Sequence, residues 1–268
     1  MSFRTSVLLL GVMSVSAAVV AKADPCPAFS TNNLPAFIAL GTGSCTLPNN
    51  ATISNFRYST STVGSVSAPA MSRQGVCAYA ACSGGSETSQ VSAVSEFFAV
   101  QDTNGFQYPI GPGNSISFNF AYTFTPPPGL NVTGAGISAG GFGVLGGPFP
   151  SGYTNAVTLC LGGTFSGFPA GTCNGTVLNL PPYTFSGPSP PPPPPPPVSF
   201  AATLSIDVLV STTLSQNISS ASPTQDFVTT PVPPPTPLPP SIILGLTGIG
   251  TLGLYQLKRA IARRNGTM

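Results

Sequence analysis

The chain has 268 residues, which is enough for one large domain or two small ones with a core of their own. It contains no His, and this excludes Ser-His-Asp and Cys-His catalysis and His-based metal sites. Between residues 24 and 257 there are two basic and six acidic side chains, a net charge of −4. Nucleic acid is therefore not expected as a partner, because phosphate neutralisation needs clustered Lys and Arg.

The amino terminus has the layout of a secretory signal peptide. Arg4 precedes an apolar stretch at residues 7–20, and a small-residue site ends at Ala23. This pattern predicts a signal helix at residues 1–23 and cleavage between Ala23 and Asp24. A membrane-spanning helix is the alternative, and the shortness of the apolar run disfavours it.

The cysteines are even in number and all follow the predicted cleavage site. In an exported protein this predicts three disulfides, and sequence alone leaves 15 connectivities open. Pairing of neighbours is our working hypothesis: Cys26 with Cys45, Cys77 with Cys82, and Cys160 with Cys173. A zinc site is disfavoured, since CxxC-like pairs and His are both missing.

Alternation of apolar and polar residues from Ala51 onward predicts strands with one buried face. The clearest is "ISFNFAYTF" (116–124). The pattern recurs in "VSFAATLSIDVLV" (198–210), where Leu204 and Ile206 are expected on the buried face and Asp207 on the exposed one. The weaker candidates are "TISNFRYST" (52–60), "SEFFAVQ" (95–101), "NAVTLCLGG" (155–163) and "GTVLNL" (175–180).

Short strands joined by Gly, Pro, Ser and Asn predict an all-β fold over residues 24–230. We expect an antiparallel β-sandwich, of which a jelly roll is one form, with long Gly/Pro loops. One such loop is the Gly-rich segment 134–152, which lacks the Lys of a phosphate-binding loop. Asn104-Gly105 predicts a hairpin turn, and this is favoured over a calcium loop at Asp102 because the later oxygen ligands are missing.

A Pro-rich loop is predicted at residues 188–197, where the unbroken proline run begins at Pro190. Polyproline of this length is a stiff spacer and is typical of linkers between domains. Only about 33 residues separate it from the next Pro-rich stretch at Pro231, too few for an independent core. We therefore expect the strand after the run to pair with strands that precede it.

The remaining route to catalysis is a carboxylate pair of the glycosidase kind. The sequence has no Trp to stack sugars, so it favours a protein that is not an enzyme, and no catalytic residue, cofactor or metal ligand is assigned. The acidic side chains available for such a pair are Glu87, Glu96, Asp102, Asp207 and Asp226.

The sequence predicts three segments at the carboxyl terminus: a Pro-rich box (231–240), a transmembrane helix (241–257) and a basic tail (258–268). The 17 uncharged residues of the helix would span about 25 Å, slightly less than a bilayer core. The basic residues place the tail on the cytoplasmic side by the positive-inside rule, and they exclude a GPI signal, which ends apolar. These residues are Lys258, Arg259, Arg263 and Arg264.

This combination of proline box, Gly-spaced apolar helix and Arg-rich end resembles the PEP-CTERM sorting signal of Gram-negative bacteria. "TPLP" (Thr236, Pro237, Leu238 and Pro239) looks like the V-P-L-P variant of its box, and "VPPP" at 232–235 is a second possible register. The commoner form has Glu where this chain has Leu238 or Pro234. The resemblance covers roughly the last 35 residues. It implies recognition by an exosortase-type membrane protease, cleavage near the box, and delivery to the cell surface or the extracellular polymer matrix.

The leading hypothesis is therefore an exported, disulfide-bonded β-sandwich of the cell surface or extracellular matrix, structural or adhesive, with a membrane-anchored precursor and exopolysaccharide as a candidate partner. The alternatives are a carbohydrate-binding module with a face of Tyr and Phe, a secreted glycan-acting enzyme, and a plain single-pass membrane-anchored surface protein.

Overall fold

The computed structural model describes residues 24–28, 32–66, 74–78, 91–99, 110, 113–144, 152–186, 192–215 and 218–233. The chain divides into two units, Met1–Thr230 and Pro231–Met268, and the fold below is that of the first. The predicted signal segment 1–23, the Asn104-Gly105 turn and all residues from 234 onward lie outside the described residues. Within the described part, no helix is long and apolar enough to cross a membrane.

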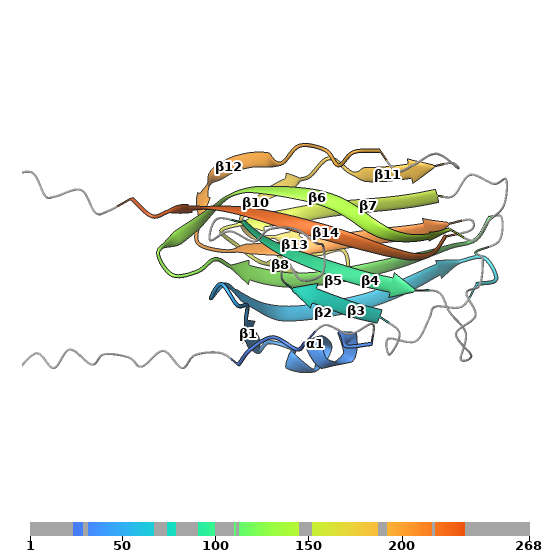
Figure 1. Ribbon diagram of the computed structural model, residues 1–268, viewed down its shortest axis with the longest axis horizontal. Coiled ribbons are helices and arrows are strands. Elements are labelled where there is room, and N and C mark those ends of the chain that lie inside the picture. Colours follow the sequence, from blue (N-terminus) through green and yellow to red (C-terminus); the bar gives the residue numbers. More distant parts are fainter. Residues whose placement is uncertain are drawn as a thin grey trace, which may run out of the picture. The chain divides into compact units, whose positions relative to one another are not determined.

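Two antiparallel sheets face each other and form a β-sandwich (Figure 1). Sheet A has seven strands: β1 (Ser44–Thr46), β2 (Thr52–Val63), β5 (Ser115–Thr125), β13 (Ile206–Ser215), β7 (Gly152–Leu161) and β10 (Thr176–Asn179) in that order, with β11 (Tyr183–Ser186) also on β7. Sheet B has the order β12 (Val198–Thr203), β6 (Leu130–Val144), β14 (Ile218–Pro231), β4 (Val91–Ala99) and β3 (Gln74–Ala78). The predicted all-β sandwich is confirmed, and its jelly-roll form stays a prediction.

The core lies between the sheets, and alternation along β5 builds its centre. Phe118, Phe120 and Tyr122 of this strand are fully buried, together with Ile116 and Phe124. Tyr122 also donates its O–H to Gln225 Oε1 on β14, at 2.9 Å. This hydrogen bond joins the two sheets inside the core, where buried polar groups need hydrogen-bond partners.

The strand predicted at 198–210 is two strands in different sheets. The chain leaves sheet B after Thr203 and enters sheet A at Ile206. Leu204, expected on the buried face beside Ile206, is 72% exposed, whereas Ile206 is fully buried. The Ser205 carbonyl accepts from Thr203 Oγ1 at 3.0 Å and from the Gly162 N–H at 3.3 Å. These bonds fix the crossover, which interrupts an alternation that looks continuous in the sequence.

Much of the Gly-rich segment predicted as a loop at 134–152 is strand, because β6 runs to Val144. Strand pairing uses backbone groups and needs no side chains. The glycines instead allow a close approach: a Cβ on Gly134 would lie 3.2 Å from the Val198 carbonyl oxygen, and one on Gly136 would lie 3.4 Å from Pro197 Cγ. The missing side chains thus let β12 and the end of the proline run lie against β6.

The part of the proline run that is described, 192–197, has no regular secondary structure and leads into β12. Tyr183 donates its O–H to the Pro192 carbonyl oxygen at 2.7 Å. After the run, β12 pairs with β6, and β13 pairs with β5 and β7. The strands on both sides of the run therefore belong to one sandwich.

A short helix that the sequence analysis did not predict, α1 (Leu34–Leu40), packs beside β2 and β3. Leu34 and Phe37 are buried, and the Phe37 ring meets the Phe56 ring edge-on at 5.3 Å. The side chain of Asn33 anchors its start, accepting from the Val76 N–H at 2.7 Å and donating to the Val76 carbonyl at 2.8 Å. These two hydrogen bonds occupy the backbone N–H and carbonyl of Val76 on β3, the last strand of sheet B.

Candidate functional site

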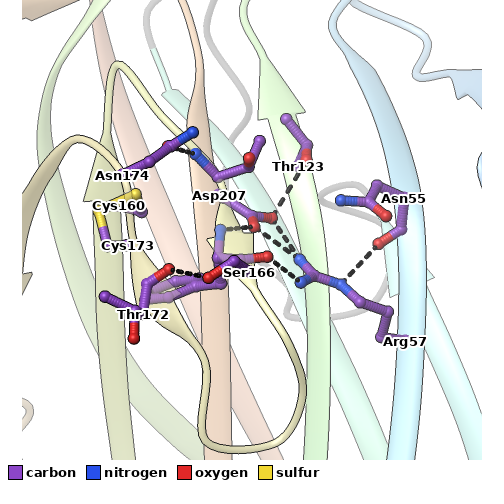
Figure 2. Close-up of polar contacts among 11 residues, drawn as sticks. Asn55, Arg57, Thr123, Cys160, Ser166, Thr172, Cys173, Asn174 and Asp207 are labelled. Atoms are coloured by element: carbon purple, nitrogen blue, oxygen red, sulfur yellow. Dashed lines mark hydrogen bonds and ion pairs between the residues drawn. A yellow bond between two sulfur atoms is a disulfide. The ribbon is translucent and has the colours of Figure 1, made fainter.

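A buried ion pair lies on the outer side of sheet A (Figure 2). Arg57 on β2 donates through Nη2 to both carboxylate oxygens of Asp207 on β13, each at 2.7 Å. Asp207 also accepts from the Thr123 hydroxyl at 3.1 Å and from the Phe165 N–H at 2.8 Å. The predicted exposure of Asp207 is wrong, since its side chain is fully buried and that of Arg57 is 18% exposed.

A bulge in β2 aims Arg57 at its partner. Pairing with β5 shifts register between Ser54 and Arg57, and Asn55 within the bulge has φ 58°. The Phe56 N–H leaves the sheet and donates to the Gly41 carbonyl at 2.9 Å. A bulge of this kind re-aims the following side chain. The guanidinium is then held further by bonds to the carbonyls of Asn55 and Phe165, each at 3.3 Å.

The hairpin formed by β8 (Phe165–Ser166) and β9 (Thr172–Cys173) covers the ion pair. The Cys160–Cys173 disulfide ties this hairpin to β7, and Phe168 lies over the Arg57 guanidinium at 5.9 Å. With its oxygens occupied by four hydrogen bonds and its charge neutralised, Asp207 is a structural group. It is not placed to act on a substrate.

Of the other candidate carboxylates, only Asp226 has a described side chain, and it does not join Asp207. Asp226 points away from the core on sheet B, whereas Asp207 lies on the outer side of sheet A, so the sandwich separates the two. Burial raises the pKa of Asp226. Glu96 lies on β4, and Glu87 and Asp102 fall outside the described residues. Among the residues described, no group of three or more His, Cys, Asp or Glu could hold a metal ion.

The predicted disulfide pairing is confirmed for two bridges. Cys26 bonds Cys45 with a Cα–Cα distance of 4.6 Å, and Cys160 bonds Cys173 at 5.5 Å. Cys77 is also disulfide-bonded. Its predicted partner, Cys82, lies outside the described residues.

The residues of the predicted sorting signal fall outside the described part: the box residues at 236–239 and the basic residues at 258–264. Of the second register, Val232 and Pro233 are described and exposed. The predicted cleavage site is described only on its carboxyl side, where Asp24 is exposed and its carbonyl accepts from the Thr46 N–H at 2.7 Å.

The outer side of sheet A, beyond the hairpin, carries two rows of small polar side chains. Strand register places one row across five strands and a second row across four. The first row is Ser61, Ser117, Thr213, Thr154 and Thr184, and the second is Ser59, Asn119, Ser211 and Ala156. We call these nine positions the hydroxyl face.

The side chains of the hydroxyl face alternate with buried core residues, so they point away from the sandwich. Ser61, Thr154 and Thr184 are exposed, and the rest are half-buried by their neighbours on the sheet. Ser117 and Thr213 share a hydrogen bond at 2.9 Å, and the Asn119 amide donates to the Ser59 hydroxyl at 3.5 Å. Neighbours across strands lie about 4.8 Å apart and the two rows about 6.6 Å apart.

The aromatic face predicted for a carbohydrate-binding module is not seen among the described residues. The large apolar side chains that are exposed there are Val63, Val177, Leu204 and Val232, and none is aromatic. The described Phe and Tyr side chains mostly fill the core instead, as along β5.

No family model and no curated protein matches the chain. Among solved structures, it is similar to TmCBM61, whose structure was solved in complex with beta-1,4-galactotriose. The two are 13% identical with a TM-score of 0.29, over 66% of this chain and 88% of that one. A similarity of this size carries no argument about ligand or function.

Proposed function

We propose that the protein is an exported component of the cell surface or extracellular matrix, with a structural or adhesive role, delivered by a C-terminal signal of the PEP-CTERM kind. The observation that carries this proposal is the disulfide-bonded sandwich. Disulfides form and persist in oxidising compartments, and two bridges, Cys26–Cys45 and Cys160–Cys173, connect segments of this fold. The predicted signal peptide and the basic, proline-preceded tail support the same route.

The proposal assigns the protein a role that is not enzymatic. Its support is the position of Asp207, whose carboxylate is neutralised by Arg57 beneath the β8–β9 hairpin. A glycosidase needs two carboxyl groups within about 10 Å across a substrate bond. Asp207 and Asp226, the two candidates whose side chains are described, lie on opposite outer sides of the sandwich.

The C-terminal tail is proposed to be a sorting signal that a protease removes. Its apolar run is short for a lasting membrane span, and the prolines before it stop a helix at the outer surface. Extended backbone of this kind suits the active site of a membrane protease. An exosortase-type protease is the partner that the resemblance implies, and the membrane is then a transient location.

The experiment is fractionation of the native host expressing the full chain or its Pro237→Ala/Pro239→Ala variant. We expect the wild type at the surface or in the medium, and the variant as an uncleaved chain in the membrane fraction. Pro193→Ala/Pro195→Ala is a matched control, since it removes two prolines from the run at 190–197 and leaves the tail unchanged. If the box variant is exported and shortened like the wild type, the proposed signal is wrong.

A further inference from the structure

We propose that the proline run covers an open edge of sheet B and prevents another chain from adding a strand there. The run is the segment 190–197, of which 192–197 is described. The edge that it covers is the side of β6 that faces away from β14. The chain that it excludes is the edge strand of a second copy of this protein.

Strand β6 is much longer than the strand that pairs with it on this side. It has 15 residues, whereas β12 has six, and their pairing begins where Val198 lies opposite Ala135. Among the described strands, none pairs with residues 136–144 on the side away from β14. Alternate N–H and C=O groups of a strand point to each side, and an unpaired row of them is a template for another strand.

The contacts at the two ends of the described run place it along this edge. At one end, Tyr183 on β11 donates its O–H to the Pro192 carbonyl at 2.7 Å. At the other end, a Cβ on Gly136 would lie 3.4 Å from Pro197 Cγ and 3.5 Å from its Cα. The run thus passes from the edge of sheet A to that of sheet B on one side of the sandwich (Figure 1).

Proline is the residue that best ends a strand ladder. It has a carbonyl but no N–H, so the run can accept hydrogen bonds from β6 and cannot donate any to a further strand. The side of the run that faces solvent includes Pro193, Pro194 and Pro196, which are exposed. A total of 32 prolines in 268 residues does not by itself place eight in succession.

The usual protection of an edge is missing here. Native sheets often carry Lys or other charged side chains on their edge strands. Neither β6 nor the segment from the run to the end of β12 has a charged residue. In a chain with 5% charged residues, prolines can take over this role without adding charge.

The other described edges are short or occupied. At the opposite edge of sheet B, the Asn33 side chain bonds the N–H and the carbonyl of Val76 on β3. In sheet A, the outermost strands β1 and β10 have three and four residues. Short edge strands offer few groups for pairing. The long edge of β6 is the one that needs a separate cover.

The first test releases the run at one end. Tyr183→Phe removes the hydrogen bond to Pro192 and keeps the ring in the core. The matched control is Tyr58→Phe, since the buried Tyr58 hydroxyl has no hydrogen-bond partner among the described residues. Hydrogen exchange at 136–144 is measured by NMR on the exported protein, or on the full chain in detergent if it is not processed.

We expect the amides of β6 that face the run to exchange about fivefold faster in Tyr183→Phe, as the loss of one hydrogen bond predicts. The alternate amides, which face β14, should keep the wild-type rate, and Tyr58→Phe should leave both sets unchanged. Equal acceleration of both sets would show a general loss of stability and would overturn the inference. Wild-type rates at both sets in Tyr183→Phe would overturn it too.

The second test restores N–H groups to the run. Pro193→Thr/Pro194→Thr/Pro196→Thr places three donors on the proposed cover. Its control, Pro48→Thr/Pro128→Thr/Pro181→Thr, makes the same change at three exposed prolines that lie between strands. Thermal unfolding checks that both variants are folded, and sedimentation velocity measures their self-association.

The run variant should dimerise at least about tenfold more tightly than the wild type, and the control should behave like the wild type. Equal self-association of the run variant and the wild type would overturn the inference, as would the same increase in the control. A wild-type dimer that protects the run-facing amides of β6 would also overturn it. None of these results depends on removal of the tail, so failure here is distinguishable from failure of the proposed export route.

Discussion

Asp207 and Arg57 show what a single ion pair does when a chain has few charges to place. The pair neutralises both groups beneath the β8–β9 hairpin, and the carboxylate also holds the Phe165 N–H and the Thr123 hydroxyl. Burying a charge is costly unless it is paired and hydrogen-bonded, and here both conditions hold. The contact therefore fixes the hairpin on the sheet more than it adds net stability.

Asp207→Asn should destabilise the fold strongly, because it leaves the Arg57 guanidinium without its counter-charge. We expect a loss near the lower end of about 3–5 kcal/mol in the free energy of unfolding, measured by urea denaturation at neutral pH. Arg57→Met/Asp207→Asn removes the orphaned charge as well and should be more stable than Asp207→Asn alone. A change within about 0.5 kcal/mol for Asp207→Asn would mean that the carboxylate is exposed, as alternation alone predicts.

Substitution of Asp226, unlike that of Asp207, should stabilise the fold. Burial raises the pKa of its carboxyl group in the folded state, so the folded protein holds the proton to higher pH than the unfolded chain does. Below the pKa of Asp226 in the unfolded chain, this carboxyl group does not lower the free energy of unfolding. As pH rises from there through its pKa in the folded protein, the free energy of unfolding falls. Asp226→Asn should stabilise the protein at about pH 7 by more than at about pH 3, as followed by thermal unfolding. A difference independent of pH would contradict the burial of this carboxyl group.

Among the elements, the β8–β9 hairpin depends most on a covalent bond. Its two short strands have little core of their own, and the Cys160–Cys173 bridge closes a loop with a sequence separation of 13. Cys160→Ala/Cys173→Ala should lower the free energy of unfolding by about 3 kcal/mol. Hydrogen exchange at the Phe165 N–H should become faster. The Val76 N–H, which lies on sheet B and donates to Asn33 Oδ1, should be unaffected. Equal acceleration at both sites would show that the bridge stabilises the whole fold instead of the hairpin.

The elements differ in how far the sequence predicts them. β5 was predictable because its alternation is regular and one side is fully apolar. β6 was not, since Gly-rich sequence is typical of loops and its strand state depends on close packing with β12 and Pro197. The break at Leu204 depends on hydrogen bonds to the Ser205 carbonyl, which no periodicity contains. Helix α1 is too short, at seven residues, to produce a helical pattern.

At the scale of the molecule, the two sides of sheet A have different roles. The inner side packs aromatic residues against sheet B, and the outer side carries the hairpin over its ion pair and, beyond it, the hydroxyl face. The alternation along β5 places Ser117 and Asn119 on its polar side, so the sequence alone predicts that both side chains point away from the core. Their alignment with Ser211 and Thr213 could not be predicted, because it depends on which strands are neighbours and on register.

The measurement that tests the central claim most directly is the intact mass of the protein recovered from the surface or medium of its native host, before and after reduction. The account predicts a chain that begins at Asp24, ends close to the box at 236–239, and gains six hydrogens on reduction of three disulfides. A mass that retains residues 254–258 would contradict removal of the tail and favour a plain single-pass anchor. A mass unchanged by reduction would contradict the disulfide-bonded, exported state itself.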